Sequence, residues 1–473
     1  GAIGMGVIAV IMIGLYLLPG FISVLALIAY VVLMLLCLNG FNASLTLPGL
    51  AGIVLSVGMA VDANVIIFTR IKEELGAGAS VKSAIDAGFN KALSAILDGN
   101  ITTLIAAVVL YLMGVGSIKG FALTLGIGIA LSMFTALFVT KHLLKAAFTL
   151  GLQSPKLYGA KKEAKVHGYV KFSKFAYLIS FIVIAAGLVA LPVFKGKTGS
   201  TLNYSLEFTG GTSMTVDFEE RYDLAKAESD ILPVIAKAAG ISEADIQVQN
   251  VKDSNEIVFK SSELTNDQRE EVQTALEENF KVKEFNMENI SSTISNEMQR
   301  NAIISVLIAT ALMLIYIAIR FSDVKFGAAA VIALLHDVLV VFAVYSIGRL
   351  SVGNTFIACM LTIVGYSINA TIIIFDRIRE NMVSMSKESY ATIVNTSISQ
   401  TLTRTIYTSL TTFVMVFFIY IMGVPSIKEF ALTLMCGIVC GAYSSVCITG
   451  PLWYMFKTRF GKNDKNTTSK KIS

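Results

Sequence analysis

The chain has 473 residues, of which 55% are hydrophobic and 15% are charged, and its mean hydropathy is +0.70. Because ordinary soluble domains carry about 25% charged residues, this composition excludes a disordered chain, a typical soluble enzyme and a nucleic-acid binder with a basic surface. The formal net charge of +5 is spread unevenly along the chain, and its distribution predicts the topology.

Residues 1–150 contain a series of long apolar segments. They lie near residues 3–18, 21–39, 47–68, 100–118 and 120–143. A helix that rises about 1.5 Å per residue needs about 20 residues to cross a hydrocarbon core of roughly 30 Å. Because backbone groups in lipid must be bonded within their own segment, these segments predict membrane-spanning helices. The first 150 residues therefore predict a transmembrane half with five spans.

One carboxylate, Asp62, lies inside the third apolar segment. It precedes Arg70 by eight residues, which places it about 12 Å along a helix from a residue expected at the membrane surface. A charged residue at such a depth costs about 2.5–3.5 kcal/mol on insertion scales, so Asp62 is expected to face the interior of the helix bundle. We interpret Asp62 as an ion- or proton-binding residue, with a structural polar contact between helices as the alternative.

The composition changes after a lysine-rich linker at 151–172 and a sixth apolar segment at 173–195. Between Thr198 and Glu297 the chain has 20 acidic and 8 basic residues, a net charge of −12, whereas the rest of the chain carries +17. Residues 196–299 therefore predict a separate domain outside the membrane.

This acidic segment mixes two hydrophobic periodicities, which predicts a small α+β domain. Residues 204–208 and 213–218 alternate like the strands of a hairpin, with Thr209, Gly210 and Gly211 in its turn. The other predicted elements are helices at 222–239 and 264–279 and strands at 245–251, 256–260 and 281–287, with a turn at 253–255.

Residues 300–456 contain a second series of apolar segments, near 301–320, 325–348, 354–376, 402–423 and 428–456, and a basic tail follows at 457–473. His336 and Asp337 lie within one of these segments, where they could relay protons or form a packed polar contact. Arg404 begins another, where it could reach inward to Asp62 or remain an arginine at the interface. The sequence leaves both pairs of alternatives open.

Basic residues gather in the loops after the third and ninth apolar segments, in the linker at 151–172 and in the tail at 457–473. All four regions fall on one side of the membrane when the spans are counted, and the positive-inside rule makes that side cytoplasmic. The acidic domain is then extracytoplasmic. The five cysteines lie within apolar segments, so we expect no disulfide framework, metal site or cofactor, and no enzymatic nucleophile is evident.

The two membrane halves repeat one another in the same orientation. Residues 111–129 match 420–438 at 14 of 19 positions, and residues 58–75 match 365–382 at 8 of 18 positions. A parallel duplication relates two membrane halves by an axis along the membrane normal. By this symmetry we expect a further span and soluble domain upstream of the present N-terminus, and therefore a fragment of a longer protein.

The repeat also pairs polar residues. Asn369 is the equivalent of Asp62, and Thr371 is the equivalent of Asn64. We expect Asn64, Asn369 and Thr371 to meet Asp62 near the axis between the halves, either as part of its site or as hydrogen bonds between helices. Arg404 has Ala95 as its equivalent, so it is specific to the second half.

Several motifs resemble one family. Residues 47–68, LeuProGlyLeuAlaGlyIleValLeuSerValGlyMetAlaValAspAlaAsnValIleIlePhe, resemble the SecD signature. PheThrGlyGlyThr at 208–212, GlyTyrSerIleAsn at 365–369 and PheAspArgIleArgGluAsn at 375–381 resemble SecF. The order of these motifs, the spans and the basic linker are similar to a fused SecD/SecF protein over essentially the whole chain.

The resemblance implies a multi-pass protein of the bacterial cytoplasmic membrane, related to resistance-nodulation-division (RND) transporters, that uses the proton motive force to assist the Sec translocase. Its implied partners are the SecYEG channel, SecA and YajC, together with unfolded exported polypeptides and membrane lipids, and no nucleic acid. By motif, Asp62 matches an essential carboxylate and Arg404 a functional arginine. The run Phe208, Thr209, Gly210 and Gly211 matches a turn or substrate motif.

One position departs from the family pattern, because Ala370 stands where SecF proteins usually have an aspartate. Asp62 would then titrate alone, His336 and Asp337 would contribute, or sodium would be the coupling ion. Two other functions remain as alternatives: a small-molecule or lipid exporter of the same superfamily, and a translocase scaffold without ion coupling.

Overall fold

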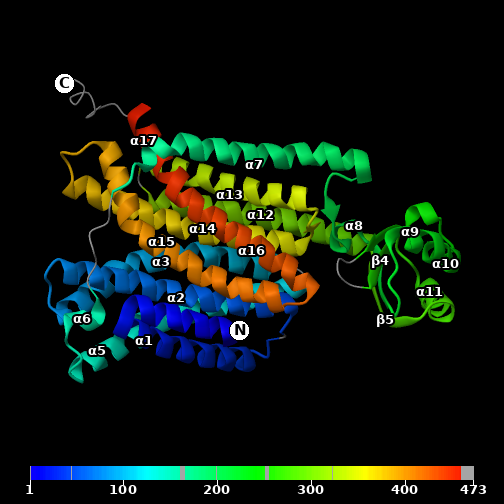
Figure 1. Cartoon of the computed structure of the whole chain (residues 1–473), viewed down its shortest axis with the longest axis horizontal. Helices are drawn as coiled ribbons and strands as arrows, with labels where there is room; N and C mark the ends of the chain where they lie inside the picture. Colours follow the sequence, from blue (N-terminus) through cyan, green and yellow to red (C-terminus); the bar gives the residue numbers. More distant parts are fainter. Residues whose placement is uncertain are drawn as a thin grey trace. The chain divides into compact units, whose positions relative to one another are not determined.

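The computed structural model describes residues 2–459 except 44, 115, 160–165, 199, 251–254 and 322. The lysine-rich stretch 160–165 of the predicted linker and the tail beyond residue 459 therefore lie outside the described residues. The chain divides into two compact units (Figure 1). The membrane unit comprises Gly1–Leu202, Ser305–Leu350 and Thr355–Ser473, and the sheet unit comprises Asn203–Ile304 and Ser351–Asn354.

Ten helices among the described residues are long and apolar enough to span a membrane. The first half contains α1 (Ala2–Gly40), α2 (Leu47–Gly76), α3 (Val81–Met113), α4 (Ser117–Phe134), the π-helical segment η1 (Thr135–Thr140) and α5 (Lys141–Thr149). A short helix α6 (Pro155–Tyr158) and the long α7 (Tyr169–Thr198) follow. The second half contains α12 (Ser292–Arg320), α13 (Val324–Gly348), α14 (Asn354–Ser384), α15 (Tyr390–Met422), α16 (Pro425–Ser444), the π-helical segment η4 (Ser445–Thr449) and α17 (Gly450–Arg459).

Helix α1 combines two of the predicted spans. Its 39 residues would measure about 59 Å if straight, nearly twice the thickness of the hydrocarbon core. Leu17 interrupts the helix with a φ of 54°, and a Cβ added to Gly20 would lie 2.0 Å from the carbonyl oxygen of Met12. Because eight residues of straight helix extend about 12 Å, the chain must fold back at Leu17, between the predicted spans 3–18 and 21–39.

Equivalent helices of the two halves begin and end at equivalent residues or within one or two residues of them. Helix α15 lies 309 residues after α3 at both ends, and the side chains of Ser80 and Ser389 cap their N-termini in the same way. The last span of each half contains a π-helical segment, η1 or η4, and these segments begin 310 residues apart. The parallel duplication predicted from the sequence is therefore confirmed.

Glycines bring the two halves close together at two equivalent crossings. A Cβ on Gly58 of α2 would lie 3.0 Å from the Cα atom of Thr412 on α15. A Cβ on Gly365 of α14 would lie 2.9 Å from the Cα atom of Thr103 on α3. Each crossing joins a helix of one half to a helix of the other, so polar groups near these glycines lie at the contact between the halves.

The sheet unit is built on a four-stranded antiparallel sheet with the strand order β3-β4-β2-β5. Its strands are β2 (Gly211–Phe218), β3 (Gln247–Asn250), β4 (Glu256–Ser261) and β5 (Val282–Ile290). Its helical segments are α9 (Leu224–Lys226), η2 (Ala227–Ile231), α10 (Leu232–Ala239), η3 (Glu243–Asp245) and α11 (Asn266–Asn279). Alternate side chains of β2, such as Met214 and Val216, share one buried core with Ile235 of α10 and Leu276 of α11. The predicted antiparallel pairing of β3 with β4 is confirmed, and residues 253 and 254 of the predicted turn lie outside the described residues.

The predicted hairpin of residues 204–208 and 213–218 is wrong. Leu206–Thr209 form a helical turn, α8, and β1 (Asn203–Tyr204) pairs in parallel with β6 (Ser351–Val352). Gly210 and Gly211 connect α8 to β2 with φ angles of 68° and 105°. A Cβ on Gly211 would lie 2.2 Å from the carbonyl oxygen of Ser261 on β4. The glycine pair therefore serves a close approach of two backbones, which a short alternating pattern cannot reveal.

Candidate functional site

Asp62 lies on α2 at the contact between the two halves. It is 4% exposed, and its Oδ1 atom accepts a hydrogen bond of 3.3 Å from the Thr411 hydroxyl on α15. In the described part of the chain, no lysine, arginine or histidine is within ion-pair distance of it. Asp62 also borders a cavity with room for about one water molecule, lined in addition by Asn100 and Tyr366. The Tyr366 and Thr412 hydroxyls are further hydrogen-bond partners of Asp62. A buried carboxylate without an ion pair is still costly when ionised, and protonation removes that cost.

Arg404 lies on the same helix as Thr411, about two helical turns earlier. It is 5% exposed, and its Nε and Nη2 atoms have no hydrogen-bond partner among the described residues. Its electrostatic neighbours include Asp62, Arg70 and Glu73. The structure therefore places Asp62 and Arg404 in one buried region, on helices of different halves, without an ion pair between them.

The three residues predicted to support Asp62 separate in the structure. Asn369 lines the same small cavity as Asp62. Asn64 instead accepts a hydrogen bond of 2.9 Å at its Oδ1 atom from the Thr140 hydroxyl, within the first half. A helix turns by about 100° per residue, so a side chain two positions after Asp62 points to the opposite side. Thr371, the equivalent of Asn64, is likewise buried and is not among the residues that line this cavity.

Four charged residues that the repeat makes equivalent in pairs form one ring. Glu73 contacts Arg70 at 2.9 Å and Arg377 at 2.6 Å. Glu380 contacts the same two arginines at 3.4 Å and 3.3 Å. The ring carries no net charge and joins α2 to α14. The sequence repeat revealed both pairs, but nothing in it indicated that they meet.

A second ion-pair cluster joins α3, α12 and α14, and no sequence motif indicated it. Arg320, at the end of α12, contacts Asp98 of α3 at 2.5 Å and Asp376 of α14 at 2.8 Å. The Tyr316 hydroxyl donates to the other oxygen of Asp98 at 2.7 Å. Because positions 98, 320 and 376 are far apart in the sequence, no local pattern could have related them.

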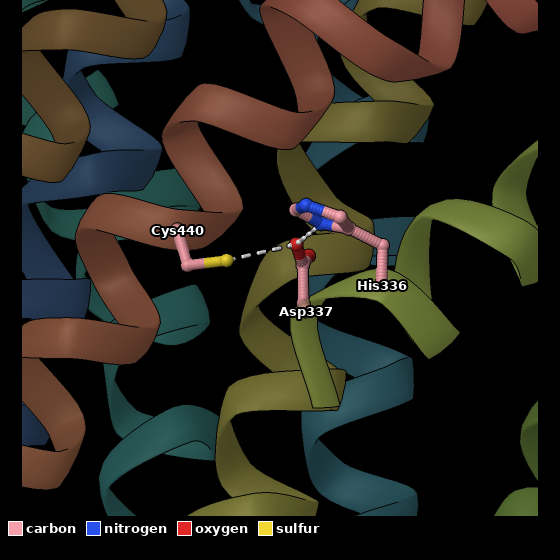
Figure 2. Close-up of side chains that lie close together, drawn as sticks. All are labelled: His336, Asp337 and Cys440. Atoms are coloured by element: carbon pink, nitrogen blue, oxygen red, sulfur yellow. Dashed lines mark hydrogen bonds and ion pairs between the residues drawn. The ribbon is translucent and has the colours of Figure 1, made fainter. Parts of the chain in front are cut away.

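His336 and Asp337 belong to a different buried cluster, which also contains Cys440 (Figure 2). The His336 Nδ1 atom lies 2.9 Å from Asp337 Oδ1, and the Cys440 thiol donates to the same oxygen at 3.3 Å. One ligand atom from each of the three residues lies within 4.8 Å of the others, a donor set that zinc accepts. The structure does not bring this cluster into contact with Asp62 or Arg404 within the described residues.

The predicted motif Phe208, Thr209, Gly210 and Gly211 lies at the junction of α8 and β2. The carbonyl oxygen of Phe208 accepts a hydrogen bond from the Gln299 side chain, and the Thr209 hydroxyl donates to the Ser205 carbonyl at 3.2 Å. These contacts give the motif a structural role, and substrate binding by it stays a prediction.

Glu207, which precedes this motif, was not predicted. Its Oε2 atom accepts a hydrogen bond of 2.9 Å from the backbone N–H of Asn354, where α14 begins. Burial raises the pKa of Glu207 above its ordinary value of 4.5, and the hydrogen bond from Asn354 opposes that shift. Glu207 and Asn354 both belong to the sheet unit, so this hydrogen bond fixes the first residue of α14 within that unit.

Acidification is expected to stabilise the wild-type protein relative to a Glu207→Gln variant. Because the folded-state pKa lies above the unfolded value, the stability that Glu207 contributes is full below about pH 4.5 and is lost as the pH rises through the folded-state pKa. Glutamine is neutral at every pH. The melting temperature of the wild type minus that of the variant should therefore increase as the pH falls from neutrality, and a pH-independent difference would contradict this account of Glu207.

Comparisons with known proteins agree with the motifs. Residues 2–149 and 271–459 match the family model described as protein export membrane protein SecD/SecF, C-terminal, and residues 198–220 match the SecD/SecF GG motif. The chain is 35% identical to protein translocase subunit SecDF of Bacillus subtilis (strain 168) over 98% of this chain and 64% of that protein. It is 32% identical to protein translocase subunit SecF of Alicyclobacillus acidocaldarius over 61% of this chain and 92% of that protein.

Solved structures show the same likeness. The crystal structure of SecDF from Thermus thermophilus, described as a translocon-associated membrane protein, matches with a TM-score of 0.88 and 34% identity, covering 97% of this chain and 62% of that one. SecDF in its super-membrane-facing form matches with a TM-score of 0.74, covering 97% of this chain and 61% of that one. The chain thus spans less than two thirds of the length of these SecDF proteins.

Proposed function

The chain belongs to the SecD/SecF family of protein export membrane proteins, and from this premise we propose that it is an auxiliary part of the Sec translocase that uses an ion gradient to drive late steps of protein export. Its proposed partners are the SecYEG channel and unfolded exported polypeptides, with SecA and YajC as further candidates. The description of the Thermus thermophilus relative as translocon-associated supports this kind of partner.

We place the protein in the bacterial cytoplasmic membrane, with the sheet unit on the extracytoplasmic side and the C-terminal tail in the cytoplasm. The charge distribution supports this orientation. Residues 198–297 carry a net charge of −12, and the rest of the chain carries +17. Loops rich in lysine and arginine remain on the cytoplasmic side of a membrane.

The proposed coupling begins with the charge state of Asp62. When Asp62 is protonated, its side chain carries no charge and does not attract the Arg404 side chain. Arg404 then interacts with its other charged neighbours, Arg70 and Glu73. When Asp62 releases its proton, a buried anion forms on one half while Arg404, with two unbonded donor atoms, lies on the other half. Attraction between them then favours a different fit of α15 against α2. The observation that carries the proposal is this placement of an unpaired carboxylate and an unpaired arginine on opposite halves.

The energy available is of the size that such a change needs. Removing one partner of a buried charge pair costs about 3–5 kcal/mol, which is somewhat less than the roughly 5.5 kcal/mol that shifts a two-state equilibrium completely from 1:99 to 99:1. The two halves meet at the glycine crossings of Gly58 and Gly365, where close packing allows discrete alternative fits rather than continuous deformation. Alternation between two fits of the halves is therefore the proposed motor step.

Export into inverted membrane vesicles tests this function. Vesicles that contain the full-length protein and the SecYEG channel would receive a proton gradient or a sodium gradient, each imposed separately while ATP is held constant. We expect the proton gradient to raise the rate of export several-fold and a protonophore to cancel the increase. Stimulation by the sodium gradient alone would instead identify sodium as the coupling ion. Export that the protein stimulates equally with and without either gradient would instead support a scaffold function. Ala370, which stands where relatives usually have an aspartate, favours that alternative.

A further inference from the structure

Three guanidinium nitrogens in the region of Asp62 are buried without a hydrogen-bond acceptor. They are Nε and Nη2 of Arg404 and Nε of Arg377. Arg404 is only 5% exposed, and no carboxylate of the described residues lies within ion-pair distance of it. A buried charge without a partner costs more than a polar group that lacks one hydrogen bond. A structural contact does not explain Arg404, because these buried donors make none.

The two arginines lie at the same level of the helix bundle. A short loop joins α14 to α15, so the two helices are antiparallel neighbours. The Asn381 side chain donates to Gln400 Oε1 at 2.9 Å, which sets their register. Arg377 precedes Asn381 by four residues and Arg404 follows Gln400 by four, so both lie about one helical turn from this contact in the same direction. The two guanidinium groups are therefore electrostatic neighbours.

The groups that surround Arg404 leave an excess of positive charge. The ion-pair ring of α2 and α14 is close by and carries no net charge. Lys72 of α2 adds a cation, since its Nζ atom lies 4.5 Å from the centre of the Tyr16 ring of α1, and this phenol is another neighbour of Arg404. With Asp62 protonated, Arg404 and Lys72 have no compensating carboxylate among the described residues. Ionised Asp62 compensates one of these two charges.

The nearby aspartates of the second ion-pair cluster cannot supply the missing charge. Asp98 and Asp376 share Arg320, and Asp376 also contacts Arg379 at 3.8 Å, so that cluster has two cations for two anions. A water molecule can accept hydrogen bonds from Arg404, but it leaves the excess charge in place. An anion satisfies both the donors and the charge.

The exposed fraction of the side chains decreases from the surface of the unit to Arg404. The side chains of Glu380 and Arg377 are 47% and 12% exposed, and Arg404 is 5% exposed. The ring thus extends from water to the buried donors, which gives a dissolved ion an approach. Because so little of Arg404 is exposed, a monatomic anion fits this position better than a phosphate group or a lipid headgroup.

We propose that Arg404 and Arg377 bind a chloride ion through these three nitrogens, and that the ionised Asp62 carboxylate competes with chloride for Arg404. Chloride is then the counter-ion of Arg404 while Asp62 is protonated, and ionisation of Asp62 displaces it. By linkage, proton binding at Asp62 and chloride binding at Arg404 strengthen each other by the same factor. The site stands on the surroundings of Arg404, and its part in export rests on the proposed function.

Binding of radioactive chloride to the full-length protein in lipid nanodiscs tests the site. Chloride would be varied against gluconate at constant ionic strength, and bound chloride measured by equilibrium dialysis. We expect one saturable site per chain, which bromide displaces and which Arg404→Gln abolishes. Arg404→Lys keeps the charge but loses the planar fork of donors, so it should bind chloride several-fold more weakly. Arg379→Gln is the matched control, because Arg379 is 45% exposed, and it should bind chloride as the wild type does.

Competition with Asp62 has its own readout in the same measurement. In the wild type, the chloride concentration that half-saturates the site should rise several-fold as the pH is raised and Asp62 ionises. In Asp62→Asn, which cannot ionise, it should keep its low-pH value throughout. An equal pH response in the two proteins would overturn the competition.

Two results would overturn the site itself. One is the absence of saturable chloride binding to the folded wild type, which would leave water as the acceptor for these donors. The other is binding that persists unchanged in Arg404→Gln. Neither result depends on export, so failure of the chloride site is distinguishable from failure of gradient-driven export, which the vesicle assay reports.

Discussion

Stimulation of export by an ion gradient is expected to disappear when Asp62 is replaced by asparagine, while insertion and folding remain normal. Asparagine keeps nearly the same volume and a side-chain oxygen that can accept from Thr411, but it cannot take up or release a proton. The contact between α2 and α15 would then remain in one charge state. In the vesicle assay, the ratio of export with and without the gradient should fall to about one, with gradient-independent export preserved.

Asp86→Asn is the matched control, because this aspartate of the same half has a side chain that is 44% exposed and pairs with Lys145 at 2.7 Å. It should retain full stimulation. Arg404→Gln should reproduce the loss seen with Asp62→Asn, because it removes the charge that the ionised carboxylate attracts. Full stimulation in Asp62→Asn vesicles would refute the coupling role of Asp62, whatever the wild type does.

Loss of Arg320 is expected to be the most destabilising of the single charge substitutions in the membrane unit. Arg320→Ala would leave Asp98 and Asp376, whose side chains are 13% and 23% exposed, without their shared cation. Breaking a buried pair by removing one partner costs about 3–5 kcal/mol, and the partial exposure of these groups favours the lower end. The midpoint of thermal unfolding in lipid nanodiscs should therefore fall by several degrees.

A combined variant separates charge from packing. Replacing Arg320 with methionine and both aspartates with asparagine removes all three charges, so most of the lost stability should return. Arg379→Ala is the control, since Arg379 is 45% exposed and contacts Asp376 at 3.8 Å, and it should cost less than about 1 kcal/mol. Equal losses for Arg320→Ala and Arg379→Ala would show that the cluster is not a buried one.

The membrane fold was largely predictable, because hydropathy reports directly on the apolar surface that a span must present. Hydropathy fails to predict where some helices begin. Helix α3 begins at Val81, although the apolar segment that predicted it begins near residue 100. A helix that continues into polar surroundings loses the hydropathy signal but keeps its hydrogen bonds. The repeat was equally visible, since equivalent helices preserved their contacts and therefore their residues.

The sequence could reveal a site residue where a single side chain makes burial in the membrane energetically costly. It could not reveal a cluster that is assembled from several distant residues. Asp62 stood out because a carboxylate inside an apolar segment requires an explanation. The groups around the Asp337 carboxylate come from α13, α14 and α16, and they are a histidine, two serines and a cysteine, none of which is conspicuous in the sequence by itself. The repeat pairs Asn64 with Thr371 and suggested a place near Asp62, whereas Asn64 accepts a hydrogen bond from Thr140 within the first half. A repeat relates residues of the two halves but does not show which side of its helix each one faces.

The ring of Arg70, Glu73, Arg377 and Glu380 has a mechanical consequence. Each glutamate already contacts both arginines, so a rotation of one half against the other can lengthen one contact while it shortens the next. No charge is left alone at any stage of such a movement, and the electrostatic energy of the ring changes little. The ring therefore has the properties of a pivot for the proposed alternation of the two halves, since it would hold them together at one level while the contact near Asp62 changes.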